Sequence, residues 1–157
     1  MYKRKIQVFV FDLDFTLWNA GDTFCSETNP PYLWEEGKLL DRSGRWMRLY
    51  PDTLEILNTL QSIDNIIIAS ASRTEIPGNA MQLMEVFDIG KYFNIKEIYP
   101  GSKIEHMKRI QEQVNCPFDQ IVFFDDELRN IEIVSALGAK CVLVENGISL
   151  NLVNEYI

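Results

Sequence analysis

Cysteine and histidine are scarce in this chain of 157 residues, which contains three cysteines and one histidine. Cys25, Cys116 and Cys141 are scattered, are odd in number and form no Cys-x-x-Cys pair. This pattern argues against a disulfide framework and a structural zinc site, and it favours a reducing compartment. We therefore expect each cysteine to be a small buried or loop residue and the protein to be cytoplasmic.

Long hydrophobic runs are also missing. The apolar run from Val8 to Phe11 is far too short to cross a bilayer, and Asp12 follows it directly. No long apolar stretch leads into the small residues of a signal-peptide cleavage site, so we expect no secretory signal. The sequence therefore predicts that no membrane is a partner of this protein.

Positive charge is in deficit, because 15 lysines and arginines stand against 23 aspartates and glutamates, for a formal net charge of −8. The densest basic group is Lys3, Arg4 and Lys5. A chain of this charge repels phosphate backbones and anionic lipid, so we expect no nucleic-acid partner. The hydrophobic content of 46% is enough to form a buried core, which argues against intrinsic disorder.

Nearly continuous apolar runs indicate strands that are buried on both faces of a parallel sheet. They span residues 6–11, 66–71, 121–124 and 141–144, and a weaker strand is expected at 97–99. Helical apolar patterns separate them after Pro51 and Asp52, around residues 83–87, over 104–114 and over 131–137. This alternation predicts a doubly wound, Rossmann-like α/β fold with a mainly parallel sheet.

One segment interrupts the alternation. Residues 18–50, called the flap below, are rich in Asn, Pro, Gly, Asp and aromatic residues and are too long for a plain connection between a strand and a helix. Its aromatic residues favour a folded structure such as a hairpin, and it is too short for an independent cap domain. Arg42, Arg45 and Arg48 recur within it and form either a solvated face or a contact to an anionic substrate. We expect residues 1–157 to form one domain.

Chemistry-bearing residues follow the strands at one edge of the predicted sheet, where α/β proteins bind ligands. They are Asp12, Asp14, Ser72, Arg73, Lys103, Asp125 and Asp126. Four carboxylates gathered there repel one another unless a cation compensates them. Carboxylate oxygens are ligands of Mg²⁺, and lysine, arginine and serine bind phosphate. The set predicts a Mg²⁺-assisted phosphoryl-transfer site, without saying which aspartate attacks.

The sequence Asp12-Leu13-Asp14-Phe15-Thr16 resembles the DxDxT motif of the haloacid dehalogenase (HAD) superfamily. The later serine, lysine and paired aspartates follow the order of that superfamily's motifs. More narrowly, FDLDFTLW, ASRTEI, EIYPGSK and VFFDDELRNI are similar to the magnesium-dependent phosphatase family. The resemblance covers most of the chain and is weakest in the flap. It implies a HAD-like fold without a cap domain and a Mg²⁺-dependent phosphatase.

The resemblance also implies a role for each matched residue. Asp12 would be the nucleophile that forms an aspartyl-phosphate, and Asp14 the general acid and then the general base. Ser72, with the adjacent Arg73, would hold phosphate oxygens, although Ser70 lies on the same side of its strand and is an alternative. Lys103 would balance the charge of Asp12 and of the transferred group.

The same resemblance implies a Mg²⁺ ion held by Asp12, the backbone carbonyl of Asp14 and Asp126, with Asp125 in that shell or just behind it. The family is associated with aryl phosphates such as phosphotyrosine and with sugar or fructosamine phosphates. An open cleft would accept either a small-molecule phosphate ester or a protein-bound phosphate.

Two other classes of protein share some of these features. A receiver-like phospho-acceptor domain also has an acidic Mg²⁺ pocket with an aspartate, a hydroxyl and a lysine. It places its acidic pair after the first strand and its acceptor after a middle strand, however, and that order differs from this one. A silent interaction module would lack a motif residue, and none is missing. His106 falls off the apolar stripe of its helix, so we expect it to be exposed and without a role in phosphoryl transfer.

Overall fold

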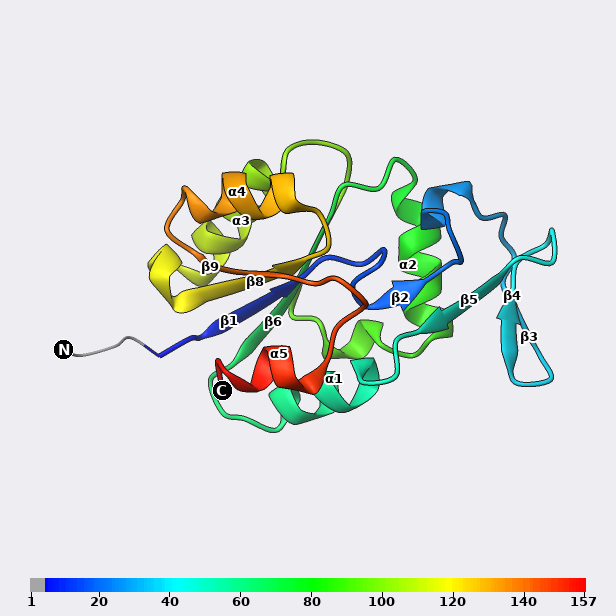
Figure 1. The fold of residues 1–157 in the computed structure, drawn as a ribbon, viewed down its shortest axis with the longest axis horizontal. Coiled ribbons are helices and arrows are strands. Elements are labelled where there is room, and N and C mark those ends of the chain that lie inside the picture. Colours follow the sequence, from blue (N-terminus) through cyan, green and yellow to red (C-terminus); the bar gives the residue numbers. More distant parts are fainter. Residues whose placement is uncertain (1–4) are drawn as a thin grey trace.

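The central sheet has five strands, and all its neighbouring strands are parallel (Figure 1). Their order is β7 (Ile95–Ile98), β6 (Ile67–Ser72), β1 (Val8–Phe11), β8 (Ile121–Asp125) and β9 (Lys140–Leu143). The computed structural model describes residues 5–157, so Lys3 and Arg4 of the basic group lie outside the described residues. The predicted doubly wound α/β fold is confirmed, with strand ends that differ from the prediction by one or two residues.

Both faces of the sheet are covered, which explains the continuous apolar runs. Helices α1 (Thr53–Gln61), α2 (Pro77–Val86) and α5 (Leu150–Asn154) pack on one face, and α3 (Lys103–Val114) and α4 (Leu128–Ser135) on the other (Figure 1). On the first face Phe9 and Phe11 stack on Phe124, with ring centroids 6.4 and 5.1 Å apart. On the second face the core of the sheet contains smaller residues such as Val10 and Ala71.

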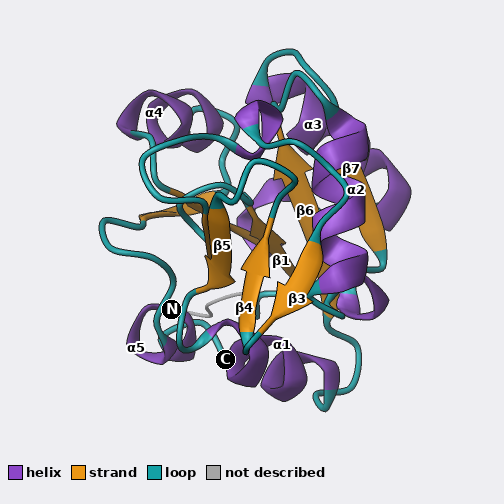
Figure 2. Ribbon diagram, turned by 90° about the vertical axis from the view of Figure 1, so that its right-hand side faces the viewer, coloured by secondary structure: helices purple, strands orange, loops and turns teal. Residues whose placement is uncertain are grey.

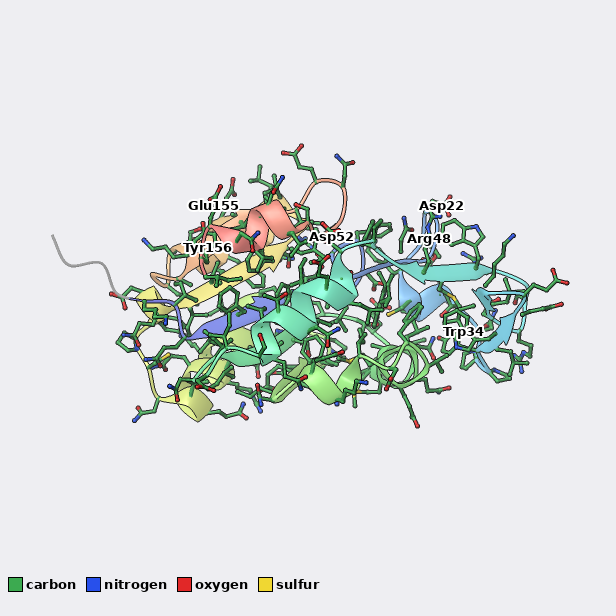
Figure 3. The ribbon with its side chains drawn as sticks, turned by 90° about the horizontal axis from the view of Figure 1, so that it is seen from below. Asp22, Trp34, Arg48, Asp52, Glu155 and Tyr156 are labelled. Carbon is green, nitrogen blue, oxygen red and sulfur yellow. The ribbon has the colours of Figure 1, made fainter. Side chains whose placement is uncertain are left out.

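The described part of the chain also contains three short 3₁₀ helices: η1 (Cys25–Glu27), η2 (Gly90–Tyr92) and η3 (Phe118–Gln120). The sequence did not predict α5, which begins after Ser149, whose side chain accepts a hydrogen bond from the backbone N–H of Leu152. Asp52, before α1, ties the two helices together by accepting a 2.9 Å bond from the backbone N–H of Leu150 (Figure 3). Among the described residues, none of the helices is long and apolar enough to span a membrane.

The flap folds into a small antiparallel sheet of its own (Figure 2). Its strands lie in the order β2 (Trp18–Asn19), β5 (Trp46–Leu49), β4 (Lys38–Leu40) and β3 (Leu33–Glu35). Strands β3 and β4 form a hairpin whose two-residue turn, Glu36 and Gly37, has φ angles of 51° and 81°. Two positive φ angles are what the tightest hairpin turns require, and glycine supplies one of them without strain.

The order of the strands determines where a ligand can bind. The chain leaves β1 for β6 and β7 on one side and then crosses to β8 and β9 on the other. In such sheets the crevice lies at the carboxyl end of the strand where the order reverses, which here is β1. The flap follows β1 directly and lies beyond that end of the sheet (Figure 1).

Candidate active site

A single tight turn follows β1 and carries the first two aspartates. The carbonyl oxygen of Leu13 accepts hydrogen bonds from the backbone N–H groups of Thr16 and Leu17, at 3.1 and 2.9 Å. Phe15 adopts a φ of 63°, a left-handed conformation that is rare for a bulky residue. The backbone N–H of Asp12 donates to Phe124 in β8, so the turn starts from the sheet itself. This tight turn places the carboxylates of Asp12 and Asp14 at the wall of the same cavity.

Lys103 is a buried cation at the floor of this cavity, with an exposed fraction of only 1%. Its Nζ lies 2.9 Å from Oδ1 of Asp12 and 3.0 Å from Oδ2 of Asp125, and it donates to the carbonyl oxygen of Ala71. Burial alone would lower the pKa of Lys103, but the two carboxylates outweigh burial and raise it. The ammonium group is therefore charged and fixed between two strands.

Three carboxylates meet beside this lysine. Asp12, Asp125 and Asp126 each offer an oxygen, and these oxygens lie within 4.8 Å of one another. Burial, and next the charge of Asp125, raise the pKa of Asp126 to about 6, while a hydrogen bond with Asp12 opposes them. Burial likewise raises the pKa of Asp12 well above its ordinary value, although the positive charge of Lys103 acts to lower it. Hard carboxylate oxygens at this spacing fit a divalent cation such as Mg²⁺.

The two aspartates after β8 differ in their contacts. Asp125 is fully buried, and its carboxylate accepts bonds from the backbone N–H of Glu127 at 2.8 Å and from the side-chain amide of Asn130 at 3.2 Å, besides its contact to Lys103. Asp126 is half-buried and also lines the cavity. Asp125 is thus committed to protein partners, whereas Asp126 is the more open of the two.

Asp14 is held by the flap. Its Oδ1 accepts hydrogen bonds from the indole Nε1 of Trp18 at 2.8 Å and from the backbone N–H of Cys25 at 2.9 Å. Burial raises the pKa of Asp14, and these two hydrogen bonds lower it in part. A carboxyl group with a raised pKa is suited to hold and release a proton near neutral pH.

The end of β6 brings in hydroxyl and guanidinium groups. Ser72 lines the cavity, and its Oγ accepts a 3.2 Å bond from the backbone N–H of Thr74. Ser70 is also buried, but it is not among the residues of the cavity wall, and its Oγ has no hydrogen-bond partner within residues 5–157. Arg73 lines the cavity as well, with its Nε 2.7 Å from the carbonyl oxygen of Gly101.

The cavity has a volume of about 370 Å³, enough for a phosphate group and part of a leaving group. All seven residues singled out in the sequence line it. It also contains residues that the sequence did not single out: Phe24, Ser26, Glu27, Thr74, Glu75, Glu127, Arg129 and Asn130. Those from the flap belong to a stretch without a recognisable motif. Thr74 and Glu75 lie within ASRTEI, and the last three lie within VFFDDELRNI, so these motifs could have revealed them.

The prediction that His106 is exposed was wrong, because its side chain is completely buried. The ring stacks on Tyr99, with centroids 4.3 Å apart. Its Nδ1 and Nε2 lie 2.8 Å from the carbonyl oxygens of Ser102 and Tyr99, respectively. His106 therefore joins the two ends of the loop that leads into Lys103.

The three flap arginines lie outside the cavity. Arg42, Arg45 and Arg48 are exposed, and none of them is among the residues of the cavity wall. The guanidinium of Arg48 lies 4.8 Å from the centre of the Trp46 ring, and Trp34 is on the same sheet (Figure 3). The structure therefore favours a solvated face over a contact to an anionic substrate for these arginines.

Comparison with known proteins shows the family of this chain. The model of the acid phosphatase family matches residues 4–157. Human magnesium-dependent phosphatase 1 is 46% identical over 154 residues, which cover 97% of this chain and 85% of that protein. A HAD-like hydrolase superfamily protein of Schizosaccharomyces pombe is 33% identical over 134 residues, covering 79% of this chain and 77% of that protein.

Solved structures with the same fold belong to the same superfamily. A haloacid dehalogenase-like hydrolase from Streptococcus pneumoniae has a TM-score of 0.66 at 13% identity, covering 95% of this chain and 90% of that one. The N-terminal part of BF1531 from Bacteroides fragilis, a phosphatase domain in complex with Mg²⁺, has a TM-score of 0.63 at 19% identity. The match covers 98% of this chain and 38% of the Bacteroides fragilis chain.

The sequence motifs, the fold and these relatives agree, so the predicted superfamily, the phosphatase class and magnesium as the cofactor are confirmed at the level of the family. The chain belongs to the acid phosphatase family, within the HAD superfamily.

Proposed function

We propose that this protein hydrolyses phosphate monoesters through a covalent aspartyl-phosphate on Asp12. The observation that carries this proposal is the position of Lys103, a buried cation joined to Asp12 and Asp125 beside an acidic trio at the floor of an open cavity. A fixed positive charge next to a carboxylate lets a phosphate dianion approach an oxygen nucleophile that would otherwise repel it.

In the first step, an oxygen of Asp12 attacks phosphorus and the bond from phosphorus to the leaving oxygen breaks. Asp14 gives its proton to that oxygen as it departs. Lys103 compensates the negative charge of Asp12 and of the transferred group, and Ser72 and Arg73 bind the phosphoryl oxygens. Asp14 lines the same cavity as Asp12, which allows the two carboxylates to divide these roles.

In the second step, Asp14 takes a proton from a water molecule, which attacks the aspartyl-phosphate and releases inorganic phosphate. Asp12, Asp126 and the backbone carbonyl of Asp14 would hold the Mg²⁺ ion, with Asp125 in the same shell or behind it. When bound, the ion neutralises charge on the carboxylates and on the phosphoryl oxygens. The carboxylate of Asp125 already accepts hydrogen bonds from Glu127 and Asn130, which supports a position behind the residues that contact the ion.

The substrate is a small-molecule phosphate ester or a protein-bound phosphate, either of phosphotyrosine type or a sugar or fructosamine phosphate. The flap contributes Phe24, Ser26 and Glu27 to the cavity, so it selects the leaving group. We place the enzyme in the cytoplasm because Cys25, Cys116 and Cys141 are all free. The net charge of −8 supports the absence of a nucleic-acid partner.

Multiple turnover of p-nitrophenyl phosphate with Mg²⁺, abolished by EDTA, tests the activity. A receiver-like phospho-acceptor domain would instead stop after one phosphorylation. Rapid quench with a labelled substrate tests the covalent step, because an aspartyl-phosphate is short-lived and reacts with hydroxylamine. Turnover without any such intermediate would show that water attacks the phosphate directly.

A further inference from the structure

The two oxygens of Asp14 have different surroundings. Both N–H donors that reach the carboxylate from Trp18 and from the backbone of Cys25 point at Oδ1. Trp18 and Cys25 are completely buried, so these two hydrogen bonds are shielded from water. An oxygen that accepts two N–H bonds has its lone pairs engaged, which leaves Oδ2 as the oxygen that carries a transferable proton.

The donor at Cys25 is itself held from outside the flap. Cys25 is the first residue of η1, a single 3₁₀ turn of three residues that is too short to be stable without outside contacts. The side-chain amide of Asn79, in the first turn of α2, donates to the carbonyl oxygens of Cys25 and Thr28, each at 3.0 Å. Asn79 is only 5% exposed. One buried amide therefore binds the carbonyl groups at both ends of this turn to a helix of the main domain.

We propose that Asn79 is a positioning residue for the general acid. It fixes η1, and the backbone N–H of Cys25 in turn orients Asp14 so that Oδ2 faces the leaving group. This inference rests on the proposed function, in which Asp14 is the acid. In the step it serves, an Asp12 oxygen bonds to phosphorus, the leaving oxygen takes the electron pair of the broken bond, and the proton on Oδ2 moves to that oxygen.

A wrongly oriented acid affects substrates differently according to their leaving group. p-Nitrophenolate is a stable anion and departs without a proton, whereas an alkoxide must be protonated as it leaves. Loss of acid orientation therefore slows the transfer from an alkyl phosphate much more than the transfer from p-nitrophenyl phosphate. A change that only reduces the amount of folded enzyme lowers both rates by the same factor.

The test compares kcat/KM for p-nitrophenyl phosphate and for glycerol phosphate at saturating Mg²⁺. For Asn79→Ala we expect an additional loss of roughly ten- to a hundredfold with glycerol phosphate, a part of what general acid catalysis contributes. Asn58→Ala is the matched control, because Asn58 accepts a bond from the hydroxyl of Tyr92 and does not line the cavity. Its ratio of the two rates should equal that of the wild type.

A second variant removes the donor itself. Cys25→Pro deletes the N–H at the first position of a turn, where proline is well tolerated, and Phe24 before it has the extended conformation that proline requires. It should change the ratio in the same direction as Asn79→Ala. Equal losses with both substrates in both variants would overturn the role of Asn79.

Asp14→Asn separates this inference from the proposed function. If Asp14→Asn loses glycerol phosphate hydrolysis selectively and Asn79→Ala does not, Asp14 is the acid and only the positioning role fails. If Asp14→Asn slows both substrates equally, Asp14 is not the acid and the proposed function itself is wrong at that point. A selective loss in both variants supports the two proposals together.

Discussion

At the scale of single residues, the pairing of Lys103 with two carboxylates determines how the site tolerates substitution. Removing one partner of a buried ion pair leaves an uncompensated charge, which commonly costs about 3–5 kcal/mol. Lys103 has two such partners, Asp12 and Asp125, so the loss of either one still leaves it paired. Asp12, the proposed nucleophile, can therefore be neutralised with little damage to the fold.

Asp12→Asn should abolish turnover while the fold stays intact. The amide keeps the size of the side chain but is a poor nucleophile, and loss of a nucleophile typically costs at least about a thousandfold in kcat. One of three mutually repelling carboxylates disappears, and Lys103 retains Asp125. We expect an unchanged circular dichroism spectrum and a melting temperature close to that of the wild type. Substantial activity in this variant would exclude the covalent mechanism.

The burial of His106 was not predicted because the buried face of its helix is partly polar. The residues of α3 that point inward are Lys103, His106, Met107 and Ile110, which have the i, i+3, i+4, i+7 spacing of one helix face. Counting only apolar residues shifts that face by one position, toward Ile104, because two of the four inward residues are polar. Hydrophobic periodicity finds a buried face only where that face is apolar.

His106→Phe should lower both stability and catalysis. The phenyl ring preserves the stacking on Tyr99 but has no nitrogen to face the carbonyl oxygen of Tyr99, while the carbonyl oxygen of Ser102 keeps the backbone N–H of Glu105 as a donor. A carbonyl oxygen left without its donor costs about 1–3 kcal/mol, and the loop that precedes Lys103 loses its polar contact to the ring. We expect urea unfolding to show a loss in that range, and kcat with p-nitrophenyl phosphate to fall.

The control for this prediction is Arg109→Ala on the same helix. Arg109 is exposed, pairs with Glu105 at 3.3 Å and lies over the Tyr99 ring. An exposed pair contributes little, so this variant should unfold at nearly the same urea concentration as the wild type and keep its kcat. If His106→Phe behaves in the same way as Arg109→Ala, the ring does not anchor the loop.

At the scale of elements, the flap depends on one buried carboxylate. Asp41 accepts hydrogen bonds from the backbone N–H groups of Asn29, Ser43 and Arg45, at 2.8 to 2.9 Å. These bonds join the turn between β4 and β5 to the segment that follows η1. Burial would raise the pKa of Asp41, but the three N–H groups outweigh it and lower the pKa below its ordinary value.

Asp41→Ala should destabilise the protein in a pH-dependent way. At pH 7 we expect a cost of about 1–3 kcal/mol, because three N–H groups lose their acceptor. Since the folded pKa lies below the unfolded value of about 3.9, the contribution of Asp41 is complete above that value and is lost as the pH falls through the folded pKa. Urea unfolding between pH 3 and 7 should show the difference from the wild type shrinking in acid.

Asp22→Ala is the matched flap control, because Asp22 is an exposed aspartate on the same segment (Figure 3). It should unfold as the wild type does at every pH in the series. A difference between Asp41→Ala and the wild type that does not change with pH would contradict the assignment, since it would show that the ionised carboxylate is not what holds the turn.

The elements that could be predicted are those with buried apolar residues on both sides. Strand β1 contains only buried residues, and its pattern is unambiguous. The flap strands have two to four residues each, and β3 is exposed along its whole length, so hydrophobic patterning carries no signal there. Helix α5 has five residues, which is too short for a helical period to stand out.

At the scale of the whole molecule, the site separates into a predictable and an unpredictable part. Asp12, Lys103 and Asp126 could be predicted because parallel strands bring their carboxyl ends to one edge. The contact of Asn79 with Cys25 could not, because it joins residues 54 positions apart through a turn whose path depends on tertiary packing. Local sequence specifies the catalytic groups, and the folded chain specifies how they are oriented.

Part of the net charge of −8 is concentrated where Mg²⁺ would bind, so the ion should stabilise the whole fold. Binding to the folded state alone adds about 2.7 kcal/mol at a hundred times Kd. For a chain of this size that corresponds to a rise of roughly 5–10 °C in melting temperature. Thermal unfolding at pH 7.5 with Mg²⁺ and with EDTA measures the difference, and Asp126→Asn should reduce it.

The size of this Mg²⁺ effect should depend on pH in a direction that follows from Asp126. Its pKa of about 6 in the folded protein lies above the unfolded value, so without metal its contribution to stability is present in acid and lost as the pH rises through about 6. Mg²⁺ needs the ionised carboxylate, so protons compete with it below that pH. The rise in melting temperature should therefore be small at pH 5 and should reach a plateau above pH 7. The same rise at both pH values would contradict the combination of a raised pKa and a metal-binding role for Asp126, because a ligand that titrates in this range must release its proton when the metal binds.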